Sequence, residues 1–154
     1  MSNNTHILVI DDEPDVLNMI ERVLKLEDYI VTTAINGKQA LEKLHETPFD
    51  LVITDIRMPG MDGLELIRQI RAFNPLIEVI VLSGYATLEN AIEALKEGGA
   101  FYFVMKPLND IDSFYHIISQ ALQKRQLIIE NQKLVRQLKT ANELLEDQIK
   151  QKNS

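Results

Sequence analysis

Polar side chains directly follow four short apolar runs of this sequence, and their types indicate a chemical site. Asp11 and Asp12 come after HILVI, Asp55 after LVIT, Ser83 after VIVL, and Lys106 after FYFVM. If these runs are neighbouring parallel strands, their carboxyl ends meet at one edge of a single sheet, which is where such sheets bind ligands. Three carboxylates, a hydroxyl and an ammonium group would then converge at a place suited to binding a metal ion and handling a phosphoryl group.

The three aspartates are the part of this set that indicates a metal. At a strand end that turns into a loop, Asp11 and Asp12 can both face a cation, and Asp55 supplies a third carboxylate. Such carboxylates repel one another unless a divalent cation lies among them, and Mg²⁺ accepts one or two carboxylates together with carbonyl oxygens and waters. We therefore predict a Mg²⁺ site. Taken alone, the aspartate pair ahead of Pro14 could instead cap a helix.

Asp55 and Lys106 together indicate phosphoryl chemistry. A carboxylate can attack phosphorus and form an acyl phosphate, and a metal on one side with a lysine on the other would neutralise the new charge. Pro107 holds the backbone of the preceding Lys106 extended. Ser83 could donate its hydroxyl to a phosphoryl oxygen, and Gly84 lets the loop approach closely.

Segments with helical periodicity separate the apolar runs, so strand and helix alternate five times. In the fourth helical segment, for example, Leu88, Ala91, Ile92 and Leu95 share one face. Strands that are apolar throughout are buried on both faces, as in a parallel sheet covered by crossover helices. We therefore predict a doubly wound α/β domain in which only the run 29–34 is half-exposed, as an edge strand would be.

The last helix can continue to the end of the sequence, because no Pro or Gly occurs beyond Ala121. A heptad pattern with mainly β-branched residues at a and Leu at d favours two parallel strands, and an Asn at an a position sets the register at a cost in stability. We predict a helical coiled-coil extension over 124–154 that forms a homodimer; the alternative is a helix folded back onto the domain. The a residues are Ile128, Val135, Asn142 and Ile149, and the d residues are Asn131, Leu138 and Leu145.

Composition excludes several classes of protein. Residues 1–119 carry 19 acidic and nine basic side chains, so the concentrated basic surface that nucleic-acid binding requires is missing. The chain has no cysteine, which excludes disulfides and thiolate metal sites and fits a reducing cytosol. Neither a signal peptide nor an apolar run near the ~20 residues of a membrane span is present. We therefore expect a cytoplasmic protein with no membrane association and no direct nucleic-acid binding by this segment.

Four motifs, taken in order, closely resemble the receiver domain of two-component response regulators. They are Asp11-Asp12-Glu13, Asp55 with the following IRMPGMDG (56–63), Ser83-Gly84, and Lys106-Pro107. The resemblance covers about residues 5–123. It implies a five-stranded parallel sheet in the flavodoxin-like order 2-1-3-4-5 with five helices, the last of which would extend into the coiled coil.

The resemblance also implies a role for each site residue. Asp55 would be the phosphoacceptor that takes a phosphoryl group from a phosphohistidine of a sensor histidine kinase. Lys106 would pair with the phosphoryl oxygens, Ser83 would move toward them, and the rotamer of Phe103 would follow Ser83. The ligands of Mg²⁺ would be Asp11, Asp12, Asp55 and the backbone carbonyl of Arg57. The switching surface, a second candidate dimer face, would be formed by helix 87–97, strand 101–105 and helix 110–122.

Two other function classes compete with a phosphorylation switch. A Mg²⁺-dependent phosphohydrolase also uses an aspartyl nucleophile, but after the first strand, in an Asp-x-Asp arrangement, and under a separate cap. Here the first motif is Asp-Asp-Glu, and 154 residues leave no cap. A flavin-binding protein of the same strand order would need a Ser/Thr-rich phosphate loop after the first strand. We expect a switch without substrate turnover, with the phosphohydrolase as the alternative.

Overall fold

A five-stranded parallel sheet forms the centre of the domain, in the order β2-β1-β3-β4-β5. The computed structural model describes residues 4–57, 60, 62–84, 88–97 and 99–152. The observed sheet confirms the predicted α/β fold and strand order. The strands are β1 (His6–Ile10), β2 (Ile30–Ala34), β3 (Leu51–Thr54), β4 (Glu78–Ser83) and β5 (Tyr102–Met105).

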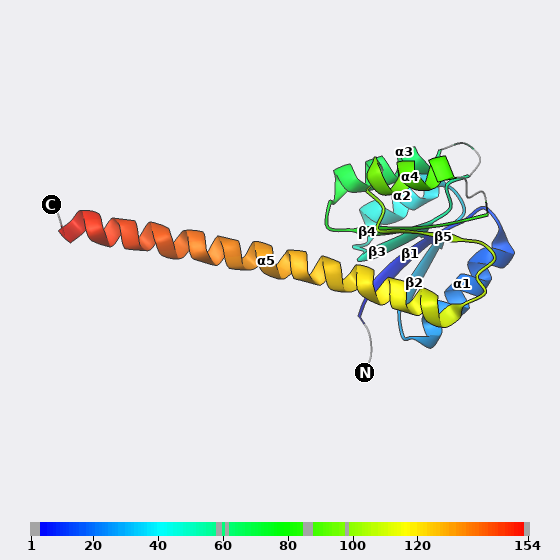
Figure 1. Ribbon diagram of the computed structural model, residues 1–154, viewed down its shortest axis with the longest axis horizontal. Helices are drawn as coiled ribbons and strands as arrows, with labels where there is room; N and C mark the ends of the chain where they lie inside the picture. The colour runs from blue at the N-terminus through cyan, green and yellow to red at the C-terminus, as the bar shows by residue number, and fades with distance from the viewer. Residues whose placement is uncertain (1–3, 58–59, 61, 85–87, 98, 153–154) are drawn as a thin grey trace.

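Five helices of the described residues cover the two faces of the sheet (Figure 1), with α2, α3 and α4 on one face and α1 and α5 on the other. Alternate residues of the central strands point to opposite faces. Leu8 and Val52 therefore pack with the first group of helices, and Ile7 and Leu51 with the second. Burial on both sides explains why the central strands are apolar except at their ends. The helices are α1 (Pro14–Leu26), α2 (Gly37–Glu46), α3 (Gly63–Phe73), α4 (Leu88–Lys96) and α5 (Ile111–Lys152).

Local sequence features mark where each of the first three helices begins. Pro14 occupies the first turn of α1, where its missing N–H is not needed. The side chain of Asn36 caps α2 by accepting a hydrogen bond from the backbone N–H of Gln39 at 2.8 Å. Asp62 caps α3 by accepting one from the N–H of Leu64 at 3.1 Å. The connections that follow β1, β2 and β3 therefore end at well-defined helix N-termini.

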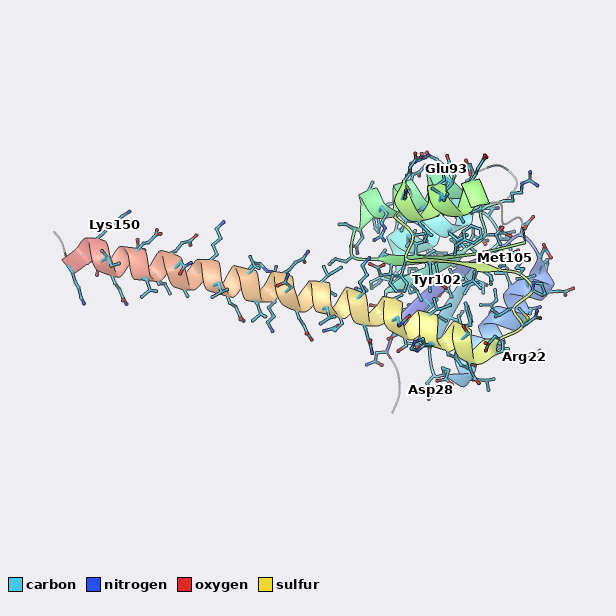
Figure 2. The ribbon with its side chains drawn as sticks, in the orientation of Figure 1. Arg22, Asp28, Glu93, Tyr102, Met105 and Lys150 are labelled. Carbon is cyan, nitrogen blue, oxygen red and sulfur yellow. The ribbon has the colours of Figure 1, made fainter. Side chains whose placement is uncertain are left out.

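The edge formed by β5 and α4 is more exposed than the sequence predicts. Among the described strands β5 pairs with β4 alone, and its Tyr102 and Met105 side chains (Figure 2) are 47% and 62% exposed. The prediction that only the run 29–34 is half-exposed is therefore wrong, because β5 is the second edge strand. The predicted apolar face of α4 is also incomplete: Ala94 is buried, whereas Ile92 and Leu95 are exposed.

Helix α5 is a single element of 42 residues, roughly 60 Å long at the usual rise per residue. Its first turns pack on the sheet through buried residues such as Phe114 and Ile118, whereas residues 130–152 are all exposed. Figure 1 shows the helix leaving the domain as a straight stalk, so it does not fold back onto the sheet. Neither α5 nor any other helix in the described part of the chain is both long and apolar enough to cross a membrane.

Candidate functional site

Three aspartates lie together at the carboxyl edge of the sheet. Asp11 and Asp12 follow β1, and Asp55 follows β3. Because these two strands are neighbours, with Ile10 paired to Thr54, the residues that follow them are adjacent. One carboxylate oxygen from each aspartate lies within 4.8 Å of the others. The three carboxylates therefore converge, as the strand ends predict.

Backbone hydrogen bonds extend the sheet by one residue into the site. The N–H of Asp55 donates to the carbonyl of Ile10 at 3.1 Å, and the N–H of Lys106 donates to the carbonyl of Ser83 at 2.9 Å. Asp55 and Lys106 thus continue the ladders of their strands instead of belonging to free loops. The carboxylate and the ammonium group are consequently presented from a rigid part of the fold.

Lys106 bridges two of the carboxylates. Its Nζ donates to Asp11 Oδ2 at 2.6 Å and to Asp55 Oδ2 at 2.9 Å. The other oxygens accept backbone hydrogen bonds: Asp11 Oδ1 from the N–H of Glu13 at 3.0 Å, and Asp55 Oδ1 from the N–H of Arg57 at 3.1 Å. Both carboxylates are therefore oriented by one ammonium and one amide hydrogen bond.

Most of the charged groups of the site are largely buried. Asp11 is 2% and Asp55 4% exposed, while Asp12 faces solvent. Burial raises the pKa of Asp11, and the hydrogen bond from Lys106 opposes that rise. Burial also acts against the charge on Lys106, but its hydrogen bonds to Asp11 and Asp55 raise its pKa above the ordinary value. The ammonium is thus charged at neutral pH, and the carboxylates still exceed it in number.

Ser83 lies on β4 and Phe103 on β5, the two paired strands beside Lys106. Ser83 ends β4, is fully buried, and is paired in the sheet with Met105, the residue before Lys106. Phe103 is partly buried and packs against the core beneath α2, α3 and α4. Both residues are placed beside the elements that carry the site. Their switching roles remain predictions.

The loop after β3 is described only in part. The N–H of Arg57 reaches Asp55, which places its peptide beside the carboxylate; its carbonyl as a metal ligand remains a prediction. Some residues of the sequence motifs and of the predicted helix 87–97 lie outside the described residues. They are Met58, Pro59, Met61 and Thr87.

Two residues near Asp55 have structural roles that sequence reasoning did not find. A Cβ on Gly63 would lie 2.5 Å from the Cα and the carbonyl oxygen of Ile56 and 2.7 Å from the carbonyl oxygen of Asp55. Only glycine therefore allows the start of α3 to approach this peptide. Thr54 is fully buried, and its hydroxyl donates to the carbonyl of Asp55 at 2.9 Å. A hydroxyl residue closing an otherwise apolar strand was the available signal for Thr54.

Taken together, the arrangement can bind a hard divalent cation and use a carboxylate as a nucleophile. Carboxylate oxygens at this spacing are the ligands that Mg²⁺ prefers. Asp55 has one oxygen held by Lys106 and the other by an amide. The ammonium group could stabilise negative charge that develops on a group transferred to Asp55.

Comparison with known proteins identifies the family. Residues 7–119 match the model of the response regulator receiver domain. The transcriptional regulatory protein ZraR of Klebsiella oxytoca is 43% identical over 121 residues, which are 79% of this chain and 27% of that protein. The C4-dicarboxylate transport transcriptional regulatory protein DctD of Rhizobium meliloti is 34% identical over 143 residues, which are 93% of this chain and 31% of that protein. The chain thus spans about a third or less of these relatives.

Solved structures agree with the sequence comparison. The response regulator protein TrrA of Thermotoga maritima, solved in complex with Mg²⁺-BeF, superimposes with a TM-score of 0.69 at 33% identity over 76% of this chain and 98% of that one. The receiver domain of response regulators is a signalling domain and not an enzyme with substrate turnover. The chain belongs to the response regulator receiver domain family and carries the three-aspartate site typical of its phosphoacceptor members.

Proposed function

We propose that Asp55 is the phosphoacceptor and takes a phosphoryl group from a phosphohistidine of a cognate sensor histidine kinase. The observation that carries this proposal is the buried Asp55 carboxylate held by Lys106 beside two further aspartates. In the transfer, a carboxylate oxygen bonds to phosphorus while the bond from phosphorus to the imidazole nitrogen breaks. That nitrogen keeps the electron pair, and a proton on the other ring nitrogen lets the histidine leave as neutral imidazole.

Mg²⁺ fits the donor set of this site. The three carboxylates lie within 4.8 Å of one another, and hard oxygen ligands of this kind suit the ion. We propose Asp11, Asp12, Asp55 and the backbone carbonyl of Arg57 as its ligands. When bound, the ion would neutralise charge on the phosphoryl oxygens. The Mg²⁺-BeF complex of TrrA, a relative of similar fold, supports this choice of ion.

Phosphorylation would then act through Lys106. Its ammonium now bridges Asp11 and Asp55, and new phosphoryl oxygens on Asp55 would compete for it. Its backbone is bonded to the carbonyl of Ser83, so the ends of β4 and β5 are coupled. We propose that the Ser83 hydroxyl moves toward the phosphoryl group, that Phe103 changes rotamer with it, and that the surface of α4, β5 and α5 shifts in population.

The test is phosphoryl labelling from a small acyl phosphate donor such as acetyl phosphate in the presence of Mg²⁺. Intact-mass measurement should find one phosphoryl group per chain, and peptide analysis should place it on Asp55. Asp55→Asn should remove at least about 99% of the labelling, because the amide is not a comparable nucleophile. The matched control is Asp28→Asn, which removes an exposed carboxylate at a positive-φ position that Asn tolerates.

Two outcomes would contradict the proposal. Labelling that survives in Asp55→Asn would place the acceptor elsewhere. Many turnovers of a small phosphate ester such as p-nitrophenyl phosphate, at a rate lost in Asp55→Asn, would favour the phosphohydrolase alternative. Labelling of the wild-type chain and the Asp28→Asn variant to the same single equivalent supports the switch.

We propose further that 5–123 form the receiver domain and that 124–154 form a helical linker that pairs in a parallel homodimer. The exposed face of α5 supports this, because Val135, Leu138 and Ile149 are 56–64% exposed and follow the heptad. Exposed apolar residues of α4 and β5 could form a second dimer contact, on the surface made by α4, β5 and α5. The similarity to DctD, which covers 93% of this chain, supports a linker that belongs with the domain.

We place the protein in the cytoplasm, in agreement with its lack of cysteine.

Leu138→Glu should dissociate the homodimer. A carboxylate at a d position would face its own copy in the apolar seam, which we expect to weaken dimerisation about 100-fold or more. The matched control is Gln137→Glu, which adds the same charge at an exposed c position. Sedimentation equilibrium of the full chain should show dimers for the wild type and the control and monomers for Leu138→Glu. A wild-type monomer, or an unchanged Leu138→Glu dimer, would contradict pairing through this seam.

A further inference from the structure

A second group of buried and half-buried charges lies at the amino-terminal edge of the sheet, opposite Asp55. Glu78 begins β4, and Asp50 precedes β3. Two consecutive residues of α5 reach these carboxylates: Lys124 Nζ lies 3.3 Å from Glu78 Oε2, and Arg125 Nη1 lies 3.0 Å from Asp50 Oδ1. We call these contacts the basal anchor. It holds α5 at the point where the helix leaves the domain.

Glu78 gives the anchor its strength. Its side chain is 1% exposed, and a carboxylate removed from water is costly unless cations compensate it. Arg71 Nη2 lies 3.6 Å away and Lys124 Nζ 3.3 Å away. Among the described residues, a movement of α5 that withdrew Lys124 would leave the buried carboxylate with only the more distant Arg71 as an ion-pair partner. The position of α5 is therefore coupled to the solvation of Glu78.

The same contacts connect Glu78 with β5 and with the loop that precedes it. Arg71 also donates to the carbonyl of Gly99 in the loop before β5, so the loop and Glu78 share one guanidinium. Lys124 Nζ lies 5.7 Å from the centre of the Phe101 ring, a cation–π distance. Phe101 enters β5, which carries Phe103 two residues later. Lys124 thus contacts the starts of both β4 and β5.

Room for a shift of the helix exists beside this contact. A groove of about 830 Å³ runs between the start of β5 and α5. Phe101 and Lys124 line it together with apolar residues of the helix such as Leu127 and Ile128. If β5 moves, α5 could therefore move with it into the space of this groove.

We propose that Lys124 and Arg125 clamp α5 to the amino-terminal edge of the sheet, and that Lys124 transmits changes of β4 and β5 to the exit of the helix. The clamp itself is a property of the resting protein. The transmission rests on the proposed function, because it requires a change at Asp55 that reaches β5. Lys124 is a positioning residue in this account, since it contacts neither the phosphoacceptor nor the metal ligands.

Amide hydrogen exchange of the full chain tests the clamp in the absence of any phosphoryl group. Lys124→Met keeps the alkyl stem and the helix propensity but removes the charge. We expect peptides around residues 118–130 to exchange roughly tenfold faster in this variant, because local opening no longer breaks the ion pair of the half-exposed Lys124 with the buried Glu78 carboxylate. Lys139→Met, an exposed lysine further along the helix, is the matched control and should exchange as the wild type does. Equal exchange in Lys124→Met and the wild type would overturn the clamp.

Two further variants keep the test decisive. Lys124→Arg retains the charge and should restore wild-type exchange. Should Lys124→Met fail to fold, Glu78→Gln removes the other charge of the pair with a side chain of the same shape. It should loosen the same peptides, and unchanged exchange in a folded Glu78→Gln protein would equally overturn the clamp.

Mg²⁺ with beryllofluoride tests the transmission. In the wild type, exchange should change both in the peptide containing Asp55 and in α5 beyond Arg125. In Lys124→Met the first response should persist and the second should be lost. Persistence of both would overturn the transmission. If the peptide containing Asp55 shows no response in the wild type, the proposed phosphoacceptor is contradicted instead. The clamp is still decided by the hydrogen exchange measured without beryllofluoride.

Discussion

Replacement of Lys106 by methionine should lower the free energy of unfolding of the metal-free protein by about 3–5 kcal/mol at neutral pH, the range found when one partner of a buried ion pair is removed. The reason is that Lys106 is the cation within 3 Å of both Asp11 and Asp55. Without it, two carboxylates that are almost fully buried face each other and Asp12 with backbone N–H donors but without an ion-pair partner among the described residues. This is the largest stability effect that we expect from a single side chain of the site.

The loss should depend on pH and on metal. Without the ammonium, burial raises the pKa of Asp11 in the folded state further above its unfolded value, because the hydrogen bond from Lys106 no longer opposes that rise. A carboxyl group shifted upward contributes stability at low pH that is lost as the pH rises through its folded pKa. The deficit of Lys106→Met should therefore shrink toward pH 4, near the ordinary aspartate pKa of 3.8. Saturating Mg²⁺ should also reduce it, because a cation among the carboxylates takes over the neutralisation.

Urea denaturation at pH 4.5 and 7, with and without Mg²⁺, measures these effects. Lys38→Met, which removes an exposed lysine of α2, is the matched control and should stay within about 0.5 kcal/mol of the wild type. A Lys106→Met protein as stable as the wild type at pH 7 without metal would show that the carboxylates are neutralised in another way. A deficit that grows on acidification would contradict the assigned cause.

Gly63→Ala should destabilise the domain by about 2–4 kcal/mol, at the upper end of overpacking effects. The added Cβ would meet backbone atoms of Ile56 at 2.5 Å and the carbonyl of Asp55 at 2.7 Å. Backbone atoms cannot move aside as the end of a flexible side chain can. Relief therefore requires α3 to withdraw from β3, which breaks the 2.8 Å hydrogen bond from Gly63 to Ile56.

Gly84→Ala is the matched control for that experiment. A Cβ on Gly84 would have its nearest contacts at 3.9 Å, to Lys106, so we expect a change in stability within about 0.5 kcal/mol. Urea denaturation of both variants in the metal-free state makes the comparison. Equal stabilities for the two variants would show that α3 adjusts without cost, contrary to the tight approach described here.

Local features of the chain were enough to predict the α/β fold class and the members of the acidic site, whereas the strand order came from the family resemblance. Each apolar run ends in a polar residue, and parallel strands bring such ends to one edge. That reasoning places Asp11, Asp12 and Asp55 together before any contact is known, and the carboxylates do lie within 4.8 Å. It fails at β5, because a run of apolar residues does not reveal whether a strand lies inside the sheet or at its edge.

The heptad pattern was equally local. Absence of Pro and Gly beyond Ala121 predicts an uninterrupted helix, and α5 runs unbroken to Lys152. Figure 2 shows its side chains, Lys150 among them, projecting from the part of the helix that extends beyond the domain. The local sequence of one chain does not determine whether a second copy or another partner packs on the apolar face of α5. The homodimer therefore remains a prediction that sedimentation decides.

The sequence by itself determined the alternation of strands and helices, the residues at the strand ends and the length of the last helix, because these depend on neighbours within a few positions. Only the tertiary structure decided that Lys106 bridges Asp11 and Asp55, which lie 95 and 51 residues away. It also decided that Glu78 is clamped by Lys124, 46 residues later. These contacts depend on strand order, register and helix placement, which are set by packing of the whole domain and not by any local pattern.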